Sequence, residues 1–434
     1  MRQAVVSWST DRTDLVTKGW QGLMLRDPVL LAPLKVPAFR RVWAGASLSM
    51  LADQAFLVIL TWLVLQVTGS GVSLGIVLAV ASVPGIILTP LGGVLSDRFP
   101  PAAVMFLSNV ARAVLMGVLA VLVFTDATKI WHVYLLAGGL SALDALYYPA
   151  SMSVVPSLVD RDRLEAANAL SQGVEQVSSV IGPALAGLLL ALVGVWTGLG
   201  TNAVLFLISA LIFSTVTRLA AAEVPDDAET EDEEEPGTLS ALVEGVRYAW
   251  GDPVIRTIML ILVGINLSMA GPIFVGGSLL AETRLGGAGA FGTLIALGGA
   301  GSLVGAMAAG TLGRVRRRGL VELGATAAMG LGVGCLAFVP NLLLACLLAA
   351  SIGGAASFLA VVNISWLQER SGDGLTGRVM SLAMFSAVAL DPISYVLAGF
   401  LVDVNLTAVF LSAGGLLLLT AFLGATSQTM RTAD

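Results

Sequence analysis

The sequence contains little charge. Asp, Glu, Lys and Arg together make up 12% of its 434 residues, whereas a soluble domain carries roughly 25%. It has a single histidine and three lysines (Lys18, Lys35 and Lys129), while 56% of the residues are apolar and the mean hydropathy is +0.90. So few polar residues cannot cover the surface of a water-soluble globular protein. We therefore expect the lipid bilayer to be the solvent of this protein.

Several kinds of chemical site lack the residues that they need. The two cysteines, Cys335 and Cys346, lie in apolar runs and indicate neither a disulfide framework nor a cysteine metal site. An ATP-driven pump is not expected, because the sequence has no Gly-x4-Gly-Lys-Ser/Thr phosphate loop. The only histidine, His132, lies at the outer start of a predicted span, so an intramembrane hydrolase has no histidine base at mid-depth. We therefore expect no enzyme, no cofactor and no metal site.

Long apolar runs fill most of the chain. A membrane-spanning helix needs about 20 mostly apolar residues, and the runs are continuous rather than alternating, as a helix requires. The predicted spans are roughly residues 42–66, 72–95, 102–124, 131–156, 167–193, 196–218, 254–281, 291–313, 320–339, 341–366, 379–403 and 405–427. The sequence therefore predicts an all-α membrane protein with 12 transmembrane helices.

The basic residues predict the orientation of these spans. If both termini are cytoplasmic, only Lys129 and Arg284 of the 23 Lys and Arg residues fall in outer loops, and Arg112 falls within a span. All the others lie on the cytoplasmic side, as the positive-inside rule requires. No apolar signal-peptide segment precedes Val42. We expect a multi-pass protein of the plasma (inner) membrane with both termini in the cytoplasm.

An acidic segment divides the spans into two sets of six. Eight acidic residues fall between Asp226 and Glu235, and they account for the formal net charge of −6. Such a charge run is typical of a solvated linker, and nothing in the sequence indicates nucleic-acid binding. An amphipathic helix is predicted from Leu239 to Trp250. The predicted units are a cytoplasmic segment (1–41), a six-helix bundle (42–218), a cytoplasmic acidic linker (219–253), a second six-helix bundle (254–427) and a cytoplasmic tail (428–434).

Short motifs recur at the ends of equivalent spans in the two halves. Gly93-x3-Asp97-Arg98 ends the second span, and basic residues follow the eighth. Gly182-Pro183-x2-Ala186-Gly187 lies in the fifth, and Asp391-Pro392 followed by Ala398-Gly399 lies in the eleventh. With these motifs the chain resembles the major facilitator superfamily. Thr68-Gly69-Ser70, Pro156-Ser157-Leu158-Val159 and Gly377-Arg378-Val379, which enters the eleventh span, resemble its branch of macrolide-efflux and enterobactin-type exporters. The resemblance implies two pseudo-symmetric six-helix bundles that transport by alternating access.

The family motifs have expected conformational roles. A carboxylate at Asp97 can accept hydrogen bonds from the N-terminus of span 11, which the resemblance places near Arg378, and so latch the two halves together. The alternative is a solvated Asp97-Arg98 turn. Pro183 interrupts the hydrogen-bond ladder of span 5, and Gly182 and Gly187 allow close approach of another backbone, predicted to be span 8. The alternative is ordinary packing.

Five ionisable residues within the predicted spans are candidates: Asp53, Arg112, Asp144, Glu175 and Asp391. Each costs about 2.5–3.5 kcal/mol at a helix centre, so an intramembrane charge is a candidate functional residue. Arg112 cannot release its proton and is expected to act on a neighbouring carboxylate. Asp391 precedes Pro392, and we expect it mainly to bond backbone groups that the kink frees. Glu175 is expected mainly near the interface.

Asp144 is the main candidate for proton or cation binding. At helical spacing it shares a face with Tyr147 and Tyr148, whose rings suit an amphipathic organic substrate. The alternative is a structural ion pair with Arg112. Asp53, beside Gln54, is the second candidate, and hydrogen-bonded packing is its alternative.

The second half offers neutral polar candidates. By family resemblance Asn266, Asn363 and Trp366 lie on helices that line the central cavity, where they can supply hydrogen bonds and one stacking surface. For each of them, packing is the alternative that we favour.

The sequence thus predicts a proton-coupled exporter of amphipathic or lipophilic small organic molecules. Its expected partners are that substrate, protons and the lipid bilayer, and the protein is expected to be monomeric. The alternatives are a proton-coupled importer of a small metabolite and a flippase for a lipid or lipid precursor.

Overall fold

The computed structural model describes residues 29–220, 247, 248, 250–312, 317–371, 376–427 and 431, with side chains except at 29, 89–98, 217–220 and 376. Within these residues all regular structure is helical, as the continuous apolar runs predict. The predicted acidic linker lies largely outside the described residues, as does nearly all of its predicted amphipathic helix. Gly93, Asp97 and Arg98 belong to the stretch without described side chains, so the predicted latch stays a prediction.

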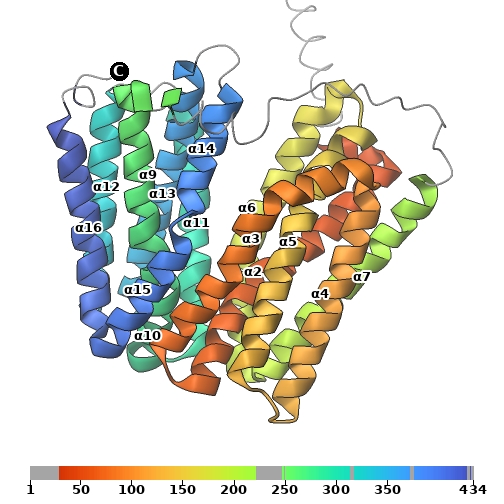
Figure 1. Ribbon diagram of the computed structural model, residues 1–434, viewed down its shortest axis with the longest axis horizontal. Helices are drawn as coiled ribbons and strands as arrows, with labels where there is room; N and C mark the ends of the chain where they lie inside the picture. Colours follow the sequence, from red (N-terminus) through yellow and green to blue (C-terminus); the bar gives the residue numbers. More distant parts are fainter. Residues whose placement is uncertain are drawn as a thin grey trace, which may run out of the picture.

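The N-terminal half forms one bundle of long helices (Figure 1). Helix α2 packs against α6 and α7, α3 against α5, and α4 against both α5 and α7. Short 3-10 turns, η1 (Val29–Lys35) and η2 (Arg161–Arg163), precede α2 and α6. The helices are α2 (Pro37–Thr68), α3 (Gly71–Arg98), α4 (Pro101–Phe124), α5 (Ile130–Leu158), α6 (Leu164–Leu192) and α7 (Val195–Ala220).

The C-terminal half forms a second bundle beside the first, and two of its predicted spans are irregular. The seventh is α9 (Pro253–Gly271), continued by two π-helical turns, η3 (Pro272–Gly276) and η4 (Ala281–Leu285), around α10 (Gly277–Leu280). The eleventh is broken into α14 (Thr376–Val388) and α15 (Asp391–Val404). The others are α11 (Ala288–Leu312), α12 (Arg318–Leu336), α13 (Leu342–Arg370) and α16 (Leu406–Thr426).

Each predicted span coincides with one helix or one such run. Among the described residues, 11 of these are long and apolar enough to cross a membrane. Helix α5 has 29 residues but is not among them. Its polar residues, including His132 and Asp144, lower its hydropathy. The count of 12 spans therefore stays a prediction.

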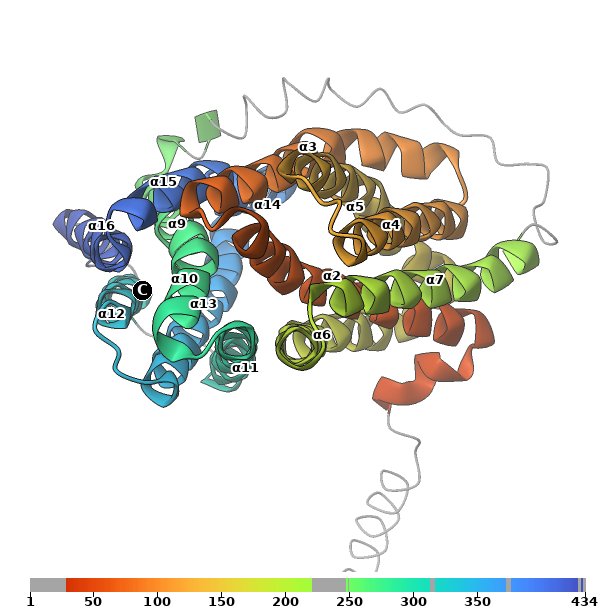
Figure 2. The ribbon, with the colours of Figure 1, turned by 90° about the horizontal axis from the view of Figure 1, so that it is seen from below.

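The two bundles contact each other closely at one end. The start of α2, the start of α9 and the C-terminus mark what we call the linker end, and the opposite end is the far end (Figure 1). Helix α6 packs against α11, and α3 packs against α15 (Figure 2). A Cβ atom built on Gly292 of α11 would lie 2.6 Å from Cα of Gly187 in α6. Only glycine permits this backbone contact.

A carboxylate also joins the bundles at the far end. Oδ1 of Asp403, near the end of α15, accepts a hydrogen bond from the backbone N–H of Gly71 at 2.9 Å, and its Oδ2 accepts one from Oγ of Ser70 at 3.3 Å. The first N–H groups of a helix have no intrahelical partner and carry partial positive charge. Asp403 of the C-terminal bundle therefore caps α3 of the N-terminal bundle.

A second cap fixes the start of the C-terminal bundle. Oδ1 of Asp252 accepts hydrogen bonds from the N–H groups of Val254 (2.8 Å) and Ile255 (3.2 Å), and its Oδ2 accepts one from Nε of Arg370 (2.8 Å). Partial burial of the Asp252 carboxyl opposes its ionisation. The backbone hydrogen bonds and Arg370 outweigh this effect and lower its pKa.

We predict that Gly292→Ala separates α6 from α11, because the added methyl group meets backbone atoms that cannot rotate away. Overpacking of this kind costs about 1–3 kcal/mol. The midpoint of thermal unfolding of the purified protein should fall. Gly310→Ala, on the same helix with open space around it, is the matched control. Equal midpoints for the two variants would contradict the close contact.

We predict that Asp252→Ala destabilises the protein at neutral pH by about 1 kcal/mol for the cap alone. Because folding lowers the pKa of Asp252, its contribution is present above the ordinary carboxyl pKa and disappears as the pH falls through the lowered value. Thermal unfolding across this pH range measures the difference from wild type. Asp160→Ala, which removes an exposed carboxyl without a cap hydrogen bond, should show no such difference.

Candidate functional site

A buried cation lies at the centre of the N-terminal bundle. The guanidinium of Arg112, on α4, is fully buried, and its two terminal nitrogens form ion pairs with carboxylates on two other helices. Nη1 lies 3.4 Å from Oδ2 of Asp53 on α2, and Nη2 pairs with Oδ1 of Asp144 on α5. The side chains of Asp53 and Asp144 are 36% and 53% exposed. One inaccessible cation thus holds two accessible carboxylates.

Aromatic rings and polar side chains fix the position of Arg112. Its Cζ lies 4.5 Å from the ring centroid of Tyr147 and 5.6 Å from that of Phe206, within the range of a cation–π interaction. Nη1 also donates to Oγ of Ser49 at 3.4 Å. Asn109 continues the network and donates from Nδ2 to Oγ of Ser209 on α7 at 2.8 Å. Side chains of α2, α5 and α7 therefore surround the guanidinium that α4 carries.

The charges of this cluster do not balance. Two ionised carboxylates and one guanidinium give a net charge of −1, and an uncompensated charge within a bilayer is costly. Binding one proton, or one cationic group of a ligand, neutralises the cluster. Among the described residues no group of His, Cys, Asp and Glu has the arrangement of a metal site.

The two predicted tyrosines do not point the same way. Tyr147 is buried against Arg112 and Phe213, whereas Tyr148 is exposed. Successive residues of a helix differ in direction by about 100°, so neighbours cannot both face one ligand. Tyr147 packs against the cation and also lines the cavity described below, whereas Tyr148 lines neither of the two cavities described here. Stacking of either ring on a substrate stays a prediction. Gln54 is half-buried, and its Cβ packs against Gly182 of α6.

A cavity of about 280 Å³ lies beside Tyr147, between α2, α4, α5 and α6. One wall is apolar and includes Trp43, Met50, Met105 and Met152. The other wall is polar and comes from α6. Its polar side chains are Asn168, Ser171, Gln172 and Glu175.

Glu175 lines this cavity, and its expected place near the interface stays a prediction. The spacing of Asn168, Gln172 and Glu175 (i, i+4, i+7) is the signal that identifies one polar helix face.

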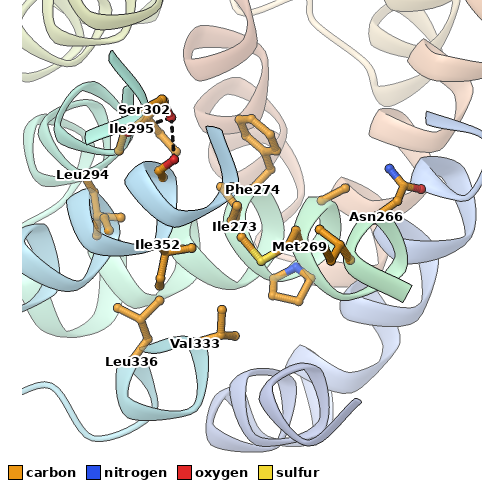
Figure 3. Close-up of a pocket in the computed structure, with 18 of the residues that line it drawn as sticks. Asn266, Met269, Ile273, Phe274, Leu294, Ile295, Ser302, Val333, Leu336 and Ile352 are labelled. Carbon is orange, nitrogen blue, oxygen red and sulfur yellow. Dashed lines mark hydrogen bonds between the residues drawn. The ribbon is translucent and has the colours of Figure 1, made fainter. Parts of the chain in front are cut away.

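A larger cavity of about 460 Å³ lies inside the C-terminal bundle (Figure 3). Its wall is mainly apolar, with side chains such as Met269, Phe274 and Ile352. Polar groups are few: Asn266 lies on one side of the cavity in Figure 3 and Ser302 on the other. Such a space suits the apolar part of an organic ligand.

The polar edge of this cavity is built on the break in the eleventh span. Nδ2 of Asn266 donates to the carbonyl of Ala387 and to Oδ1 of Asp391 (2.5 Å), and its Oδ1 accepts from N–H of Leu390 at 3.1 Å. Asn266 therefore bonds the backbone groups that the break exposes. The sequence assigned this role to Asp391, which instead bonds Asn266 and lies at the first turn of α15, where a carboxylate is stabilised.

Asn363 and Trp366 do not reach either cavity. Trp366 is buried in an apolar core with Val254 and Ile258, so it packs and offers no stacking surface to a ligand. Asn363 is buried and donates from Nδ2 to Oε1 of Glu322, on α12, at 3.1 Å. Glu322 was not among the candidate residues predicted from the sequence, although this acid lies inside the predicted span 320–339.

The glycine–proline motif of α6 faces two helices. Gly182 packs against Gln54 and Ala55 of α2, within the same bundle. Pro183 and Gly187 approach Gly292 of α11. The predicted seam with the eighth span is therefore found for Pro183 and Gly187 but not for Gly182. Arg378, near the start of α14, is half-buried.

Comparison with known proteins is consistent with this architecture. The Major Facilitator Superfamily model matches residues 42–390. The chain is 29% identical over 395 residues to the multidrug efflux pump Tap of Mycolicibacterium fortuitum, covering 88% of this chain and 92% of Tap. It is 27% identical over 363 residues to the enterobactin exporter EntS of Salmonella typhi, covering 84% and 85% respectively.

Solved structures share the fold at low sequence identity. The crystal structure of a mutant of the nucleoside transporter NupG superposes with a TM-score of 0.73 at 14% identity, covering 90% of this chain and 99% of that one. A POT family transporter in complex with 5-aminolevulinic acid gives 0.71 at 11% identity, covering 92% and 96%. With a family model matching most of its length and two bundles of the same fold, this chain belongs to the Major Facilitator Superfamily of membrane transporters.

Proposed function

We propose that this protein exports amphipathic or lipophilic small organic molecules across the plasma membrane in exchange for protons. The observation that carries the proposal is the pairing of one buried guanidinium, Arg112, with two accessible carboxylates, Asp53 and Asp144. Efflux relatives, the multidrug pump Tap and the enterobactin exporter EntS, support the direction of transport. The cavities of about 280 and 460 Å³ support an organic substrate of mixed polarity.

The exchange follows from the charge balance of the cluster. Arg112 stays protonated and holds both carboxylates in place. One proton bound by Asp53 or Asp144 makes the cluster neutral, and loss of that proton restores its negative charge. A cationic or polar group of the substrate takes the place of the proton, so the two ligands compete for one charge. The carboxylates bind and release protons without any covalent step.

Alternating access requires the bundles to part at either end in turn. The contact of Gly187 with Gly292 and the cap of Asp403 on α3 both lie at the far end. We assign the described conformation to the inward-facing state, with the linker end in the cytoplasm. Opening to the outside then breaks these far-end contacts in a rocker-switch movement of the two bundles, 42–218 and 254–427. We propose that the protein acts as a monomer, since one chain supplies both bundles and both cavities.

We predict that Asp144→Asn abolishes proton-driven export, because the cluster is then neutral with Asp53 ionised and no longer needs a proton. The host cells lack their own efflux pumps. Cells that express this variant should accumulate lipophilic dyes as strongly as cells that express the wild-type protein do in the presence of a protonophore. Asp126→Asn removes an exposed carboxyl in the turn after α4 and is the matched control. If Asp144→Asn and Asp53→Asn both retain export that a protonophore abolishes, the cluster does not couple protons to transport.

We also predict that Arg112→Met destabilises the protein, because it leaves two neighbouring carboxylates without their cation. Removing one partner of a fully buried ion pair costs about 3–5 kcal/mol, and partial exposure of Asp53 and Asp144 reduces the cost here. Thermal unfolding of the purified protein measures the loss. Combining Arg112→Met with Asp53→Asn and Asp144→Asn should recover part of it. No recovery would show that Arg112 stabilises the bundle by packing alone.

A further inference from the structure

A carboxyl and an amide form an isolated pair between α12 and α13 of the C-terminal bundle. Glu322 is fully buried and Asn363 nearly so. Nδ2 of Asn363 donates to Oε1 of Glu322 at 3.1 Å. Glu322 lies one helical turn after Arg318, where α12 begins near the linker end. The transport scheme above does not use this pair.

Two oxygen atoms of the pair have no hydrogen-bond partner in the described structure. Both Oε2 of Glu322 and Oδ1 of Asn363 are buried and unsatisfied. Each such group costs about 1–3 kcal/mol, and more when it is charged. Both atoms are acceptors, so neither satisfies the other while the carboxyl is ionised.

One proton resolves both deficits. A protonated Oε2 donates to Oδ1 of Asn363, while Nδ2 donates to Oε1, and the two groups then form a closed ring of two hydrogen bonds. Exchanging the amide nitrogen and oxygen of Asn363 does not remove the need for this proton. The amide oxygen then lies beside Oε1, and two acceptors need a proton between them to form a hydrogen bond. The geometry therefore calls for a neutral Glu322 in either orientation of the amide.

The charged groups around the pair are engaged elsewhere. Arg318, on the same helix, is bound by both carboxylate oxygens of Glu369 on α13, at 2.8 and 2.9 Å. Arg370, also on α13, pairs with Asp252. Helix α16, which packs along α12, has no charged residue.

The nearby helix α9 contributes Arg256, which donates to the carbonyl of Trp250. Arg317 precedes α12 as an exposed N-cap residue. An ionised Glu322 thus has only the amide of Asn363 as a polar side-chain contact in the described structure.

We propose that Glu322 and Asn363 form a proton-binding site in the C-terminal bundle, separate from the cluster of Asp53, Arg112 and Asp144. The site holds one proton in the described conformation. It releases the proton when water reaches the carboxyl, or when the packing of α12 against α13 changes. Arg318 lies one turn away on the same helix face, and a shift of its side chain toward the ionised Glu322 would weaken its pair with Glu369.

Infrared difference spectroscopy of the purified full-length protein in lipid nanodiscs tests this site without a transport assay. At neutral pH the wild type should show a C=O stretching band of a protonated carboxyl that is absent in Glu322→Gln and still present in Asp144→Asn. The glutamine variant should fold, because its amide reproduces both hydrogen bonds to Asn363. The same spectrum for wild type and Glu322→Gln, in a folded variant, would overturn the proposal.

A second variant tests the ring directly. Asn363→Ala removes both hydrogen bonds, so the band of Glu322 should shift in frequency. Raising the pH should replace the wild-type band with that of a carboxylate. An unshifted band in Asn363→Ala, or a carboxylate band for Glu322 in the wild type at neutral pH, would overturn the proposal even if Glu322→Gln failed to fold.

Discussion

The guanidinium of Arg112 is the interaction on which the N-terminal bundle depends. It is a permanent charge without exposed surface, and it is tolerated because Asp53 and Asp144 pair with it while Tyr147 and Phe206 face it. The same pairing makes the site responsive, because two carboxylates share one cation. The ion pairs that allow Arg112 to be buried thus involve the same three charged groups that we propose bind the proton.

The C-terminal bundle encloses a mainly apolar cavity, whereas the N-terminal bundle is built around a charge cluster. Asn266 bonds the broken eleventh span, and an apolar cavity adjoins it. The hydrogen bonds of Asn266 reach both sides of the break between α14 and α15. The bundles meet where α6 packs against α11 and α3 packs against α15, and glycine contacts and the cap of Asp403 lie in these contacts. The N-terminal bundle therefore places three charged groups at its centre, and the C-terminal bundle supplies the larger apolar cavity.

Much of this architecture is predictable from the sequence, because spans in a bilayer must be continuous apolar helices and their hydropathy identifies them. The pairing of Arg112 with Asp144 was foreseen as an alternative, since a buried cation needs a partner. The burial of Tyr147 against Arg112 was not predictable, because helical spacing does not tell which face meets the core. For Trp366 the favoured prediction, packing, is confirmed. Glu322 was missed although it lies inside a predicted span, and its partner Asn363 is distant in sequence.

Proton movement coupled to substrate is the most direct test of the central claim. Purified protein is reconstituted into liposomes with an acidic interior, and an internal pH dye reports on the lumen after a lipophilic cationic dye is added outside. The account predicts that the added dye enters while the luminal pH rises, and that neither occurs with an Asp53→Asn/Asp144→Asn double variant. Dye uptake by the wild type without any change in luminal pH would contradict proton exchange at the cluster around Arg112.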